Sequence, residues 1–184
     1  ASAAGAAAPA VAARRGAGDM DVTRFFKHLF APHWIVSRAF PGRALDAIEA
    51  AVTASEKTHD GELRFAVEAG LHPLPLWRGQ TARQRAQEIF GSLNVWDTAH
   101  NSGVLLYLQL VDRRIEIVAD RGISAKVPQL EWDSICRRME NAFKAGQFQA
   151  GALTGIAEIT ALLAAHFPAL NDNPNELPNR PVLL

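Results

Sequence analysis

The chain has 184 residues, 48% of them hydrophobic, which is enough for one domain with a sizeable core. Its 19 basic residues balance 19 acidic residues, and its aromatic residues are not interleaved with a basic run, so no nucleic-acid partner is expected. The one cysteine, Cys136, excludes an intramolecular disulfide and a CxxC metal or redox pair.

The two ends of the chain differ in composition from the middle. Residues 1–19 are rich in Ala and Gly, but Arg14 and Arg15 follow the Ala run, whereas a signal peptide carries its charge first. We interpret 1–19 as a disordered leader or an expression remnant, and 169–184, rich in Pro and Asn, as an extended tail. No stretch reaches the roughly 18 apolar residues of a membrane span, so we expect a cytoplasmic protein, or one peripheral at a membrane.

Residues 20–43 form a separate N-terminal segment that we predict to be helical up to Pro32. Its large apolar side chains share one face or follow directly after it: Phe25, Phe26, Leu29, Phe30 and Trp34. Such a face could contact a protein partner or a membrane surface. The simpler interpretation is that this short helix covers the core of its own domain.

The middle of the chain alternates between helical and strand patterns. Apolar residues at helical spacing predict a helix over Ala44–Thr58, and alternating ones predict a strand over Glu62–Ala69. Two prolines predict that Leu71–Gly79 is a loop. Thr81 can then cap a helix that runs to about Leu93.

A hairpin and two helices complete the pattern. The strand Val104–Val111 turns at Asp112-Arg113 into the strand Arg114–Ala119. Helices are predicted over about 129–145 and 147–166. Within this part Cys136 belongs to an apolar helical stripe, and Trp96 and Trp132 are interpreted as packing anchors.

This order of elements predicts an α/β/α sandwich with a small mixed sheet. The helical crossover makes the first two strands parallel, and the hairpin makes the third antiparallel to the second. The segments Asp60–Glu62, Asp97–Gly103 and Asp120-Arg121 should therefore meet at one edge of the sheet.

Several polar side chains at this edge could bind a divalent cation. The candidate ligands are Asp97, Asn101, Asp120 and Glu62. Carboxylate and amide oxygens suit Ca²⁺ or Mg²⁺. If His100 were also a ligand, the preference would shift to Zn²⁺ or Mn²⁺. The alternative is that Asp97 caps a turn and Asn101 adopts a left-handed conformation before a glycine.

Two further residues at the edge are candidates for catalysis. His100 could act as an acid or base, and Arg121 could hold a phosphate oxygen. The alternatives are a solvated His100, and an Arg121 that pairs with Asp120 or faces solvent.

The hairpin segments SGVLLYLQL and RRIEIVADRGI, and the helix junction FKAGQFQAGALTGIAEI, resemble the TPM domain, in a soluble bacterial branch of that family. The resemblance covers roughly Leu45–Phe167. It implies an α/β/α sandwich, divalent-cation binding at the strand ends, and acid phosphatase activity as in some plant members. The chain has Asn101-Ser102-Gly103 where Asp-Asn-Gly is typical, and Asp120–Ser124 where Gly-x-Gly-Leu-Glu is typical.

Two functional classes follow from this resemblance. In the first, residues 44–168 form a TPM-type module for binding or assembly, with cation binding at the strand ends, in membrane-associated protein quality control. The alternative is a metal-dependent acid phosphatase that acts on phosphomonoesters. The missing motif carboxylates favour the first class.

Overall fold

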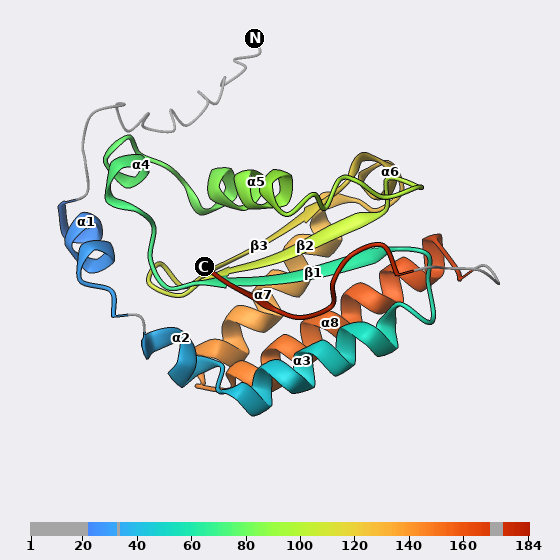
Figure 1. Ribbon diagram of the computed structural model, residues 1–184, viewed down its shortest axis with the longest axis horizontal. Helices are drawn as coiled ribbons and strands as arrows, with labels where there is room; N and C mark the ends of the chain where they lie inside the picture. Colours follow the sequence, from blue (N-terminus) through green and yellow to red (C-terminus); the bar gives the residue numbers. More distant parts are fainter. Residues whose placement is uncertain (1–21, 33, 170–174) are drawn as a thin grey trace, which may run out of the picture.

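A four-stranded mixed sheet lies at the centre of the computed structural model, which describes residues 22–32, 34–169 and 175–184 (Figure 1). The strands are β1 (Glu62–Glu68), β2 (Gly103–Gln109), β3 (Arg114–Ala119) and β4 (Val182–Leu183), in the order β3-β2-β1-β4. β1 is parallel to β2, and β3 is antiparallel to β2. The crossover and the hairpin therefore predicted the two strand directions correctly.

Three helices cover one face of the sheet, namely α3 (Gly42–Ser55), α7 (Gln129–Lys144) and α8 (Phe148–His166) (Figure 1). Alternate residues of β1, Leu63, Phe65 and Val67, pack into this layer. All seven residues of β1 and of β2 are buried, because the sheet is covered on both faces. This is the larger core of the protein.

The opposite face carries α5 (Ala82–Ser92) and a smaller core. The helix starts as predicted: the Thr81 hydroxyl accepts a hydrogen bond from the Gln84 amide, and the Gln84 side chain accepts one from the Thr81 amide. From this helix Ile89 joins the same cluster as Leu105 and Tyr107 of β2. Helices on both faces of a mixed sheet make the predicted α/β/α sandwich.

Two short helices were not predicted from the sequence. The predicted loop Leu71–Gly79 contains α4 (Pro73–Trp77). Prolines fit there because the first turn of a helix leaves its amides without intrahelical partners, and the His72 side chain caps it by accepting from the Leu74 amide. In the same way Asp120 caps α6 (Arg121–Ser124), which directly follows the hairpin.

The N-terminal part holds α1 (Val22–Leu29) and α2 (Trp34–Ala39), at the end of the sheet where β2 turns into β3 (Figure 1). The predicted leader, residues 1–19, lies outside the described residues. Among those described, α8 has a length and composition that would also suit a membrane span, but here it packs against α3 and α7 as a core helix does.

The C-terminal residues 175–184 run along the free edge of β1 (Figure 1). β4 pairs with β1 in parallel, and the Leu184 amide donates a hydrogen bond of 3.0 Å to the Val67 carbonyl. The Pro- and Asn-rich composition predicted an extended tail, but it carried no sign of strand pairing. The tail protects an edge that would otherwise expose unpaired backbone groups.

Candidate functional site

The three predicted polar segments do meet at one edge of the sheet. Glu62 is the register partner of Gly103, and its amide donates a hydrogen bond of 3.1 Å to the Ser102 carbonyl. The Asp120 amide donates one of 2.9 Å to the Gly103 carbonyl. The edge formed by 60–62, 97–103 and 120–122 is called the rim below.

Two glycines allow the backbone segments of the rim to approach closely. A Cβ atom on Gly103 would lie 1.8 Å from the Val95 carbonyl oxygen. A Cβ atom on Gly122 would lie 2.6 Å from the Asn101 carbonyl oxygen. Both positions therefore require glycine for the loop after α5 to lie against the sheet.

Asn101, Asp120 and Arg121 form the polar centre of the rim. Asn101 has a φ of 52°, the left-handed conformation considered from its sequence. Arg121 Nε donates a hydrogen bond of 2.9 Å to Asn101 Oδ1, and the Arg121 amide donates one of 2.7 Å to Asp120 Oδ1. Asp120 Oδ2 is buried and has no hydrogen-bond partner in the described parts of the chain.

Asp97 and His100 lie exposed on the loop that leads into β2. Across the three described ranges, no group of three or more His, Cys, Asp and Glu side chains is placed to hold a metal ion. The Arg121 guanidinium also places a positive charge beside Asn101 Oδ1. These residues therefore fit a multi-ligand cation site poorly, and metal binding stays a prediction.

The side chain of Glu62 makes structural hydrogen bonds instead of facing a position where a metal ion could bind. Its side chain is buried, and its two carboxylate oxygens accept hydrogen bonds of 3.2 Å from the amides of Glu176 and Leu177. It therefore fastens the C-terminal tail to the start of β1. Burial and the neighbouring charge of Glu62 raise the pKa of Glu56 to about 7, so two carboxyl groups share this buried region.

The second feature of interest lies at the opposite end of the sheet, in α1. Contrary to the simpler sequence interpretation, this helix does not cover the core with its apolar face. Its apolar side chains Val22, Phe26, Leu29 and Phe30 are exposed. They follow the i, i+4, i+7, i+8 spacing of one helical face. Phe25 is half-buried and packs edge-on against Trp77 of α4, with ring centroids 5.7 Å apart.

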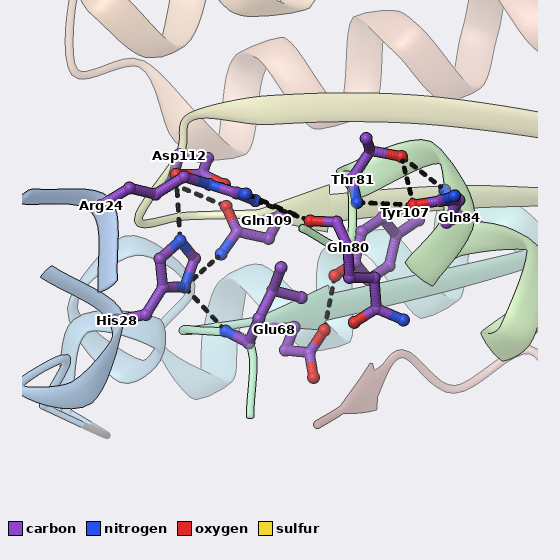
Figure 2. A network of polar contacts seen from close by, with 10 residues as sticks. Arg24, His28, Glu68, Gln80, Thr81, Gln84, Tyr107, Gln109 and Asp112 are labelled. Atoms are coloured by element: carbon purple, nitrogen blue, oxygen red, sulfur yellow. Dashed lines mark hydrogen bonds and ion pairs between the residues drawn. The ribbon is translucent and has the colours of Figure 1, made fainter. Parts of the chain in front are cut away.

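Polar contacts hold the other side of α1 to the domain (Figure 2). Arg24 Nη2 lies 2.7 Å from Asp112 Oδ2, and His28 Nε2 lies 3.0 Å from Asp112 Oδ1. The Leu71 amide donates a hydrogen bond of 2.8 Å to His28 Nδ1. Gln109 Nε2 lies 3.3 Å from the same ring nitrogen. The helix is thus inverted, with ionic groups inward and aromatic groups outward.

The contacts of Arg24 and His28 with Asp112 are called the α1 clamp below. This clamp was not predicted from the sequence, although Arg24 and His28 stand four residues apart, as two positions on one helical face do. Their partner is Asp112, the residue predicted at the hairpin turn. Only the tertiary structure brings the two segments together.

The exposed apolar side chains continue from α1 onto its neighbours. We define the aromatic surface by the exposed residues of α1, α2 and α4 and the residue after α1, namely Val22, Phe26, Leu29, Phe30, Trp34, Leu74 and Trp77. The three helices contain no acidic residue. They contribute Lys27 and Arg38, and Arg78 caps the end of α4. Trp96, predicted to be a packing anchor, is also exposed, whereas Trp132 is buried as expected.

Comparisons with known proteins agree on the type of domain. A sequence model described as the TPM domain matches residues 39–162. The NMR structure of BA42 protein from the psychrophilic bacterium Bizionia argentinensis superposes with a TM-score of 0.70 and 29% sequence identity. The superposition covers 79% of this chain and 95% of that chain. A search of curated proteins gave no match.

Proposed function

Because this chain belongs to the TPM domain family, which it matches over residues 39–162, we propose that it is a TPM-type binding module that attaches to an anionic membrane surface. Attachment would use the aromatic surface of α1, α2 and α4. The module would then present the rim at the other end of the sheet, away from the lipid. Such a module fits a role in membrane-associated protein quality control.

The observation that carries this proposal is the inversion of α1. A helix that turns Phe26 and Phe30 to solvent while burying His28 loses the burial energy of its own aromatic rings. Contiguous exposed apolar surface is typical of a site that contacts a partner or a membrane. The rings of Phe26 and Phe30 are stacked, with centroids 6.1 Å apart, so they present one continuous apolar area.

The charges around the aromatic surface favour a lipid interface over an apolar protein groove. Lys27, Arg38 and Arg78 are exposed, and the three helices supply no carboxylate. Aromatic rings flanked by cations are the composition of helices that lie in the headgroup region of anionic bilayers. Each such cation contributes about 1 kcal/mol near an anionic surface.

Vesicle binding tests the proposal. The protein should co-sediment with vesicles of phosphatidylcholine and phosphatidylglycerol, and much less with pure phosphatidylcholine. The double substitution Phe26→Ser and Phe30→Ser should weaken this binding at least tenfold, since each ring transferred to lipid contributes roughly 1–2 kcal/mol.

Leu130 provides the matched control, because it is 72% exposed, as Phe30 is, but lies on α7. Leu130→Ser should leave vesicle binding unchanged. Equal binding by the wild-type protein and the Phe26/Phe30 variant would overturn the proposal. So would the absence of binding to either kind of vesicle.

Divalent-cation binding at the rim is a second candidate function, supported by the buried Asp120 Oδ2 that has no hydrogen-bond partner among the described residues. Asp120 would supply a carboxylate ligand to such a cation. Titration with Ca²⁺, Mg²⁺, Mn²⁺ and Zn²⁺ should then shift the NMR signals of 97–103 and 120–122. Asp120→Asn should abolish the shifts, and Asp46→Asn on the exposed side of α3 should not. No response to any of the four ions contradicts this candidate.

Acid phosphatase activity needs a separate test. If Asp97→Ala and Asp120→Ala both leave the hydrolysis of a phosphomonoester unchanged, that activity comes from a contaminant.

A further inference from the structure

A cavity of about 260 Å³ opens at the end of the sheet opposite the rim. It lies at the carboxyl end of β2, where the chain turns into β3, and is closed by α2 and by the junction between α7 and α8. In open α/β sheets, ligands bind outside the carboxyl ends of the parallel strands. The rim lies at the amino ends of β1 and β2, so the two places are distinct.

The inner wall of the cavity is apolar. It is formed by Ile35, Leu108, Leu110, Ile115, Phe143 and Phe148. All six of these side chains are part of the large core or pack against it, so the surrounding core holds the wall in place. The volume of the cavity exceeds the ~150 Å³ of an engineered cavity that holds benzene. It approaches ~300 Å³, the lower limit for pockets that bind drug-sized ligands.

The mouth of the cavity is cationic. Arg113, Arg114 and Lys144 line it and are exposed, and Glu140 is the one acidic residue among the lining side chains. In the described residues, no ion pair within 4.0 Å involves any of the three cations. Arg113 has a φ of 53°, the left-handed conformation of a tight turn. This turn places the adjacent residues Arg113 and Arg114 at the mouth of the cavity.

We propose that this cavity binds a small amphipathic carboxylate, with its apolar body against Leu108, Ile115 and Phe143 and its carboxylate between Arg114 and Lys144. The apolar wall supplies burial of the hydrocarbon. The guanidinium and ammonium groups supply charge-assisted hydrogen bonds to the carboxylate. A neutral molecule of the same shape would lack these charge-assisted hydrogen bonds. Binding does not require α1 to contact a membrane, since the aromatic surface does not line the cavity.

Titration of the folded protein with octanoate, followed by NMR, tests this proposal. The amide signals of 108–115 and 144–148 should shift and reach saturation at octanoate concentrations below those at which it forms micelles. Octanol and octylammonium should bind at least tenfold more weakly, because they lack the negative charge. Equal affinity for octanoate and octylammonium would overturn the proposal.

Charge variants separate specific binding from general attraction. Arg114→Gln with Lys144→Gln should weaken octanoate binding at least tenfold. Arg43→Gln with Arg137→Gln removes the same net charge from exposed positions outside the cavity and should leave binding within twofold. Equal losses in the two double variants would contradict a defined site.

A third variant fills the cavity. Ala39 lies in its wall, so Ala39→Leu should abolish octanoate shifts while the rest of the NMR spectrum stays that of the folded protein. Saturable shifts that persist in this folded variant would overturn the proposed position of the ligand. If the substitution unfolds the domain, the charge variants decide, because their side chains are exposed.

Discussion

His28 Nε2 on α1 lies 3.0 Å from Asp112 Oδ1 on the β2–β3 turn (Figure 2). The other ring nitrogen, Nδ1, accepts a hydrogen bond of 2.8 Å from the Leu71 amide. One imidazole thus joins α1, the hairpin turn and the segment after β1. This contact, with Arg24, keeps the aromatic surface in place.

Asp112→Asn should loosen α1 and destabilise the protein by about 1–3 kcal/mol, because His28 and Arg24 lose their charged partner in a mostly buried position. Urea unfolding gives the free energy, and protection of the α1 amides from hydrogen exchange reports the local effect. Asp46→Asn is the matched control, because Asp46 is exposed on α3. An unchanged exchange rate in α1 would contradict the clamp.

The same carboxylate predicts a dependence on acid pH. Burial alone would raise the pKa of Asp112, but hydrogen bonds from Arg24 and His28 outweigh burial and hold the pKa below its ordinary value of 3.8. A lowered pKa in the folded state stabilises the protein above the unfolded pKa, and this stability is lost as pH falls further. The wild-type protein should therefore lose α1 protection below about pH 4, and Asp112→Asn should lack this transition. An identical acid transition in both proteins would show that other groups cause it.

Glu56 predicts the opposite trend near neutral pH. Burial, and then the charge of Glu62, raise the pKa of Glu56 from 4.5 to about 7. The folded state therefore binds more protons than the unfolded state between these values, and stability falls as pH rises from about 4.5 to about 7. Glu56→Gln should flatten part of this fall, and Glu62 and Glu116, whose pKa values are also raised by burial, should contribute to what remains.

The measurement is the free energy of unfolding in urea at pH values on either side of that interval. Glu131→Gln on the exposed side of α7 serves as the control and should keep the wild-type slope. A Glu56→Gln protein with the wild-type slope would mean that Glu56 is ionised throughout.

Local signals in the sequence predicted most of the sandwich. The Thr81 capping box, the alternation in β1 and the hairpin turn each depend on residues close together in the chain. The direction of α1 could not be predicted in this way, because its inward face is selected by Asp112, 88 positions after Arg24. The burial of Glu62 also depends on a distant segment, since its partners are 114 and 115 positions away.

Gly103 and Gly91 provide a matched pair of substitutions. Gly103→Ala would place a Cβ atom 1.8 Å from the Val95 carbonyl oxygen, so the loop before β2 must move, at an expected cost of more than about 3 kcal/mol. Gly91→Ala on α5 meets nothing within 4 Å and should stabilise the protein by roughly 0.5 kcal/mol. Thermal unfolding of the two variants measures the difference. Equal stability would mean that the rim backbone is less closely packed than the structure indicates.

The C-terminal tail should be coupled to Glu62. Deleting residues 176–184 removes β4 and both amide donors to the buried carboxylate, so the deletion should destabilise the protein by several kcal/mol, on the order of 3. It should also cause association, visible by light scattering, because the edge of β1 becomes available for pairing. In a Glu62→Gln background the same deletion should lower the free energy of unfolding by at least about 1 kcal/mol less than in the wild type. A buried neutral amide that loses its hydrogen-bond donors is less destabilising than a buried carboxylate that loses them. If the two deletion costs are equal in urea unfolding, the tail is held by β4 pairing alone and Glu62 contributes nothing to it.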